Sequence, residues 1–92
     1  SKVVDVIREL EKFGADVDVY DPWVSSAEAR HEYGIRPIRK PKLGTYDAVV
    51  MAVAHKEFRE LGVPEIRRLA KKQHVLYDIK HVFKRSEVDG RL

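Results

Sequence analysis

The side chains best suited to binding in this sequence follow directly after runs of apolar residues. Lys80 and His81 come after the largely apolar run 75–79, and His55 comes after the apolar run 48–54. An ammonium group can neutralise a phosphate, and an imidazole can donate a hydrogen bond to a ligand. These three residues are therefore our candidates for a binding site.

Their position matters because open parallel sheets bind ligands outside the carboxyl ends of their strands. The three predicted strands end in polar groups, at residues 20–22, 54–56 and 78–81. We expect these ends to form one crest of His, Lys and Asp side chains along an edge of the sheet. Lys80 is the main candidate, because the buried strand before it would hold its backbone rigidly.

Each candidate also has a purely structural interpretation. Lys80 can pair with Asp78 or extend into solvent. His55 and His81, each taken alone, are better explained as half-buried aromatic side chains that pack against their neighbours. Trp23 follows a strand end, where it either stacks on a ligand or partner or covers the core.

Several kinds of catalytic site are absent from the sequence. There is no cysteine, which excludes a thiolate nucleophile, a thiolate zinc site and a disulfide. There is no Gly-rich dinucleotide loop, no P-loop and no nucleophile elbow. The four histidines lack the close helical spacing of a zinc motif. We expect no catalytic residue and no metal site in this chain.

Charge and hydropathy exclude other classes of partner. Lys and Arg number 18 against 15 Asp and Glu, and the two signs are interspersed. A nucleic-acid binder concentrates positive charge on one face, so we expect no nucleic acid. The basic stretch 36–42 can bind an anion, although a solvated connection explains it better. No apolar run approaches the ~18 residues of a membrane span. Many charged residues, no Asn and a single Gln suggest a thermophilic source.

Hydrophobic periodicity predicts helices alternating with strands. We expect a helix over 1–13 and a helix over 25–33 that begins with a Ser–Glu capping box. A helical stretch from 55 should break at Gly62 and resume at Pro64, running to about 72. The predicted strands cover 15–20, 48–54 and 75–79, and residues 80–92 read as a tail with little periodicity.

This alternation predicts a single α/β domain over residues 1–92. The expected fold is Rossmann-like, with a parallel sheet covered by helices on both faces. A doubly wound unit normally opens with a strand that lies in the middle of the sheet, whereas this chain opens with a helix. We therefore expect the first strand to be missing. We also expect the chain to rearrange its strands or to dimerise across the gap.

Several phrases, taken in order, resemble a known family. They are Val17-Asp18-Val19-Tyr20-Asp21-Pro22-Trp23, Tyr46-Asp47-Ala48-Val49-Val50, His55-Lys56-Glu57-Phe58 and Tyr77-Asp78-Ile79-Lys80. Together with Ser1–Ile7, they are similar to the C-terminal domain of the UDP-glucose/GDP-mannose dehydrogenase family. The phrases around His55 and Lys80 look most like the branch that oxidises UDP-N-acetylated hexosamines for surface polysaccharides.

The resemblance implies a role within a larger cytoplasmic enzyme. That enzyme would oxidise the C6 alcohol of a UDP-sugar with NAD, bound mainly by a separate N-terminal domain, and would be a homodimer. Its catalytic cysteine and lysine would lie outside this chain, which alone would be inactive and bind no cofactor. The family pattern places Lys80, and less directly His81, against the UDP-sugar. The alternative is a stand-alone nucleotide-binding or interaction module without catalysis.

Overall fold

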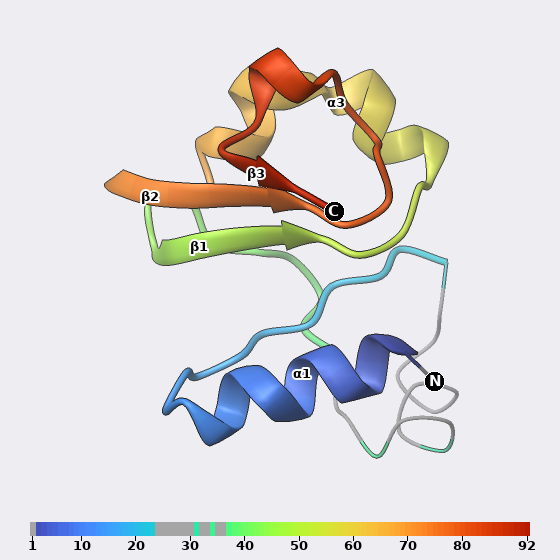
Figure 1. Cartoon of the computed structure of the whole chain (residues 1–92), viewed down its shortest axis with the longest axis vertical. Coiled ribbons are helices and arrows are strands. Elements are labelled where there is room, and N and C mark those ends of the chain that lie inside the picture. The colour runs from blue at the N-terminus through green and yellow to red at the C-terminus, as the bar shows by residue number, and fades with distance from the viewer. Residues whose placement is uncertain (1, 24–30, 32–33, 35–36) are drawn as a thin grey trace. The chain divides into compact units, whose positions relative to one another are not determined.

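The fold is that of a computed structural model, which describes residues 2–23, 31, 34 and 37–92 (Figure 1). The chain forms two compact units, Ser1–Pro41 and Lys42–Leu92.

The first unit is built on helix α1, Lys2–Lys12. Its apolar stripe buries Ile7, while exposed ion pairs at spacing i, i+3 join Arg8 to Glu11 and Lys12 to Glu9, each at 3.1 Å. The helix predicted over 1–13 is therefore confirmed. The helix predicted over 25–33 falls, apart from His31, outside the described residues.

The strand predicted over 15–20 is wrong. These residues follow α1, but none of them belongs to a strand. The N–H of Ile38 donates to the C=O of Val19 at 2.8 Å, which is one hydrogen bond and not a ladder. An alternating pattern favours an extended backbone, whereas a strand also needs a neighbouring strand beside it. Among the described residues, no strand lies beside residues 15–20.

The second unit contains a parallel sheet of three strands in the order β1-β2-β3. Figure 1 shows the strands pointing the same way. The elements are β1 (Tyr46–Met51), α3 (Lys56–Arg67), β2 (Ala70–Asp78), the 3-10 helix η1 (Arg85–Glu87) and β3 (Gly90–Arg91). This arrangement confirms an α/β fold with a Rossmann-like parallel sheet. The segment 80–92, expected to be an irregular tail, contains η1 and β3.

Strand β2 begins earlier than its sequence indicates, at Ala70 instead of residue 75. Tyr46 pairs with Ala70 and Ala48 pairs with Val75, so β2 is irregular between these two points. The carbonyl groups of Arg68 and Leu69 accept hydrogen bonds from the N–H groups of residues 44–46 at 2.8–3.2 Å. These bonds end the helix at Arg67 instead of about 72.

Strand β1 ends at Met51, although the apolar run continues to residue 54. Met51 pairs with Asp78, the last residue of β2, so residues 52–54 have no partner in β2. The apolar run therefore extends beyond the paired part of the strand.

Helix α3 is kinked where the sequence predicts a break. Gly62 has φ 83° and ψ 160°, which lies outside the helical region, and Pro64 stands in the turn that follows. Glycine tolerates this positive φ, and proline suits the first turn of a helix because it lacks an N–H.

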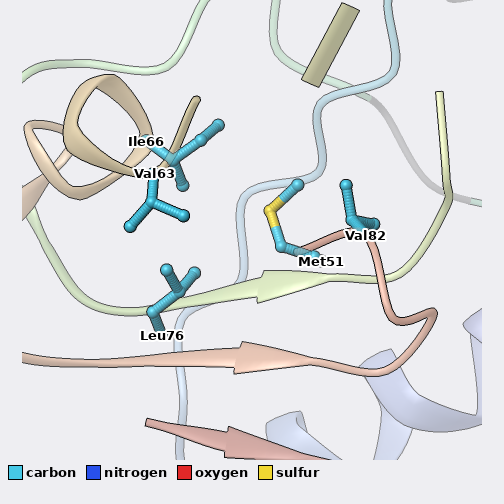
Figure 2. Packing of buried hydrophobic residues seen from close by; sticks show 5 residues of the cluster. All are labelled: Met51, Val63, Ile66, Leu76 and Val82. Carbon is cyan, nitrogen blue, oxygen red and sulfur yellow. The ribbon is translucent and has the colours of Figure 1, made fainter. Parts of the chain in front are cut away.

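The core of the second unit lies between α3 and the sheet (Figure 2). Val63 and Ile66 of α3 face Leu76 of β2, while Met51 and Val82 pack beside each other at the carboxyl ends of β1 and β2. Each such buried side chain contributes roughly 1.5–3 kcal/mol to stability. This core holds the ends of the two strands in place.

Candidate functional site

The carboxyl ends of β1 and β2 lie at the same edge of the sheet. Met51 pairs with Asp78, and one residue further on the N–H of Ile79 donates to the C=O of Met51 at 3.0 Å. The segments 52–55 and 79–81 therefore both leave the sheet at this edge. The structure brings together two of the three predicted strand ends, while residues 20–22 belong to the first unit.

The turn after β2 is held by a buried carboxylate. Asp78 has no exposed surface, and its Oδ1 accepts a hydrogen bond from the N–H of Val82 at 3.0 Å. Its Oδ2 accepts one from the N–H of Phe83 at 2.9 Å. A buried carboxylate needs such donors, because burial without them is costly. Asp78 thus ties the residues after the turn back to the end of β2.

From the sequence, Asp78 is expected either in the polar crest at the strand ends or as a partner for Lys80. No ion pair joins the two: the carboxylate is buried, with each oxygen accepting from a backbone N–H group, whereas Lys80 is exposed. One signal could have identified this role. An acidic residue inside a largely apolar strand is buried, and a buried charge requires several donors close by.

Lys80 is exposed at the middle of the turn. Within the described part of the chain, no hydrogen bond or ion pair involves its ammonium group. Of the two structural alternatives, pairing with Asp78 is thus excluded and extension into solvent is observed. An exposed ammonium that has no ion-pair partner among the described residues, on a backbone held by β2, also suits Lys80 for binding an anion.

His81 completes the turn in an unusual backbone conformation. Its φ is 56°, in the left-handed region that costs a non-glycine residue about 1–3 kcal/mol. Its side chain is exposed, and Nε2 lies within hydrogen-bonding distance of the C=O of Leu92. Because a carbonyl oxygen only accepts, Nε2 carries the hydrogen in this arrangement.

His55 precedes α3 and is half-buried. Its ring packs against Phe58 with centroids 5.7 Å apart and planes tilted by 33°, and its C=O accepts from the N–H of Phe58 at 3.1 Å. This matches the structural interpretation of a packed polar aromatic. The exposed part of the ring keeps His55 as a candidate at the same edge as Lys80.

A second polar cluster, which sequence reasoning missed, joins α3 to the segment before β3. Arg67 Nη1 donates to Asp89 Oδ2 at 2.9 Å, and its Nη2 donates to the C=O of Glu87 at 2.9 Å. Arg67 Nη1 also lies 2.9 Å from His74 Nε2. The partners Arg67 and Asp89 are 22 residues apart, so no local spacing reveals them.

Asp89 also fastens its segment to β2. Its Oδ2 accepts from the N–H of Leu76 at 2.7 Å, and its own N–H donates to the C=O of Leu76 at 2.9 Å. The hydrogen bonds from Arg67 and then from Leu76 lower the pKa of the Asp89 carboxyl. This cluster stabilises the packing of η1 and β3. It lies apart from the strand-end turn, which is the segment 79–83 that follows β2.

The structure also bears on the remaining residues and classes of site considered in the sequence. In the described ranges, no group of three or more acidic or histidine side chains could hold a metal ion. No described helix has the length and apolarity needed to cross a membrane. The N–H of Trp23 donates to Asp21 Oδ1 at 2.9 Å in a turn, which leaves both interpretations of its indole open. Arg36, at the start of the basic stretch, lies outside the described residues.

A family model described as "UDP-glucose/GDP-mannose dehydrogenase family, UDP binding domain" matches residues 1–85. The chain belongs to this family. The resemblance noted in the sequence is thereby confirmed, and the strand-end turn carrying Lys80 lies within the matched residues.

Two of the relatives of this chain are named as UDP-N-acetyl-D-glucosamine 6-dehydrogenases. The chain is 50% identical over 92 residues to UDP-N-acetyl-D-glucosamine 6-dehydrogenase of Pseudomonas aeruginosa and 44% identical to that of Salmonella typhi. In both cases the match covers all of this chain and 22% of the relative. Protein CapL of Staphylococcus aureus is 30% identical over 97% of the chain and 21% of its own length.

The chain therefore spans about a fifth of the length of these relatives. No solved structure matches the chain.

Proposed function

We propose that this chain is the C-terminal, UDP-binding part of an NAD-dependent UDP-sugar 6-dehydrogenase. Its substrate would be a UDP-hexose or, more specifically, a UDP-N-acetylhexosamine, which it would help convert to the uronic acid. The observation that carries this proposal is the family match over residues 1–85, together with relatives named for that activity at 44–50% identity.

The role of this part in the reaction is to hold the nucleotide. Lys80 supplies an exposed ammonium at the carboxyl edge of the sheet, where it can neutralise charge on the diphosphate. His55 and His81 follow the two strand ends at the same edge: the half-buried ring of His55 can donate a hydrogen bond to the nucleotide, whereas His81 would first have to release the C=O of Leu92. Binding energy gained far from the reacting carbon orients the sugar for oxidation. The catalytic residues belong to the rest of the enzyme.

NAD would accept the two hydrides removed from the C6 alcohol. The glycines of this chain, at 14, 34, 44, 62 and 90, are too widely spaced for a dinucleotide loop. The residues present here do not fit the pyrophosphate of NAD. We assign the cofactor to a separate N-terminal domain of the same enzyme, which is the partner of this chain.

The remaining properties follow from the same proposal. We propose a homodimer in the cytoplasm, where UDP-sugars and NAD are available and where a chain without cysteine is unaffected by reducing conditions. The thermophilic character suggested by composition remains a prediction. A melting temperature above about 80 °C supports it, and one in the ordinary range of about 45–65 °C refutes it.

Calorimetric titration of the chain with UDP and with UDP-N-acetylglucosamine tests the proposal. We expect both to bind, and Lys80→Ala to weaken both by about tenfold, the loss of one charge-assisted hydrogen bond. Lys72→Ala is the matched control, because Lys72 is an exposed lysine on β2 that lies six residues before Asp78. Equal effects of the two substitutions would argue against a site at the strand ends.

The same substitutions in the full-length protein test the enzymatic part. We expect Lys80→Ala to raise the KM for the UDP-sugar with little change in kcat. A full-length protein that does not oxidise any UDP-sugar would favour the stand-alone binding module instead.

A further inference from the structure

The carboxylate of Asp78 closes a short turn around Lys80. Its two oxygens accept the N–H groups of Val82 and Phe83, four and five residues further along the chain. Only Ile79, Lys80 and His81 lie between Asp78 and Val82. The carboxylate thus sets the distance between the two ends of this turn.

Both ends of the turn are also fixed to the rest of the unit. At the first end, the N–H of Ile79 donates to the C=O of Met51 at 3.0 Å. At the other end, the side chain of Val82 is 8% exposed and packs in the core beside Met51. Lys80 lies between these two anchors, with its side chain exposed.

The same hydrogen bonds hold the carboxylate inside the unit, away from the exposed side chain of Lys80. An Asp two residues before a Lys is close enough in sequence to pair with it and neutralise it. Here the carboxylate is fully buried and occupied by backbone donors. The ammonium of Lys80 therefore keeps its charge available for an anionic ligand.

We propose that Asp78 is a positioning residue for the nucleotide site. Its buried carboxylate holds the 79–83 turn in the shape that presents Lys80, and backbone N–H groups keep that carboxylate from pairing with the lysine. The left-handed backbone of His81 belongs to the same constrained turn. This inference rests on the proposed function, since it concerns how that site is built.

Asp78→Asn separates this role from simple folding. Asn has the same shape, but its amide nitrogen cannot accept a hydrogen bond, so one of the two backbone N–H groups loses its partner. In the full-length dehydrogenase we expect the KM for the UDP-sugar to rise by about fivefold to tenfold while kcat at saturation stays within about twofold. Asp47→Asn is the control, because that carboxylate on β1 is 86% exposed.

A double-mutant cycle with Lys80→Ala gives the decisive comparison. If Asp78 acts through Lys80, then Asp78→Asn raises the KM in the wild-type background and adds little in the Lys80→Ala background. Circular dichroism and a urea titration confirm that each variant is folded. Asp78→Ser, whose hydroxyl oxygen can still accept from one N–H, replaces the Asn variant if that variant does not fold.

Three outcomes overturn the inference. If Asp78→Asn is folded and leaves the KM unchanged while Lys80→Ala raises it, the positioning role fails and the proposed function stands. If the two effects multiply, Asp78 acts independently of Lys80. If neither substitution changes the KM, the nucleotide site itself lies elsewhere, and the positioning role falls with it.

Discussion

The aromatic ring of Tyr77 occupies the space that a side chain at Gly90 would need. The two residues are partners in the parallel pairing of β2 with β3, and a Cβ at position 90 would lie 2.7 Å from Cδ1 of the ring. Such a contact requires the ring or the short strand β3 to shift. The close approach of these strands thus depends on glycine for its size.

Gly90→Ala should destabilise the second unit by about 1–3 kcal/mol, the usual cost of overpacking. Urea unfolding of the chain measures this difference. The same substitution in a Tyr77→Ala background should cost much less, because the clashing ring is gone. An equal cost in both backgrounds would show that the ring is not the cause.

Asp89→Asn should lower stability at pH 7 by about 1 kcal/mol, since it weakens a half-exposed pair with Arg67 and the acceptor for Leu76. The pKa of Asp89 is lowered in the folded state, so its contribution is complete above the unfolded value of 3.8 and disappears as the pH falls through the folded value. Urea midpoints of both proteins at pH 7 and at pH 2–3 should therefore converge towards the lower pH. Glu65→Gln, which removes an exposed partner of Arg68, is the control and should change little.

The stability of variants at His81 should depend on how readily the new residue adopts a positive φ. His81→Asn should stay within about 0.5 kcal/mol of the original stability, because Asn enters the left-handed region readily. His81→Val should lower the free energy of unfolding by about 1–2 kcal/mol, because a β-branched side chain is strained in the left-handed region. Equal unfolding midpoints for the two variants would mean that the turn relaxes without strain.

Leu76→Ala should destabilise the chain by about 2–5 kcal/mol, because Leu76 is fully buried beneath α3. The neighbouring substitution Val75→Ala should cost less than half as much, since Val75 on the other face of β2 is 49% exposed. Thermal unfolding followed by circular dichroism compares the two. Similar losses would contradict the burial described for this strand.

The parts of the fold that could be predicted from sequence are those encoded by local patterns. The stripe of apolar residues around Ile7 predicts α1, and the apolar run around Val49 predicts β1. Gly62 and Pro64 predict the kink of α3, because each restricts the backbone in its own way. Because ligands bind at the carboxyl ends of parallel strands, the sequence alone also predicts that Lys80 and His55 lie at one edge of the sheet.

The parts that could not be predicted depend on partners distant in sequence. The start of β2 is decided by hydrogen bonds from residues 44–46, and β3 is fastened by Asp89 to Arg67 and Leu76. Residues 15–20 have the pattern of a strand, but a strand also requires a neighbour that the pattern does not contain. The donors to Asp78 are close in sequence, but they are backbone N–H groups, which every residue carries and which no side-chain pattern marks.

The order of the strands in the sheet has a consequence for how the second unit forms during synthesis. Because β1, β2 and β3 lie side by side in the order in which they leave the ribosome, each new strand finds its neighbour already made. Ala48 of β1 pairs with Val75 of β2, so these strands can join only after the whole of α3 has been made, and such non-local parallel pairing slows folding. The Arg67–Asp89 pair can form only after Asp89 has been made, and it then joins the segment before β3 to a helix that was made earlier.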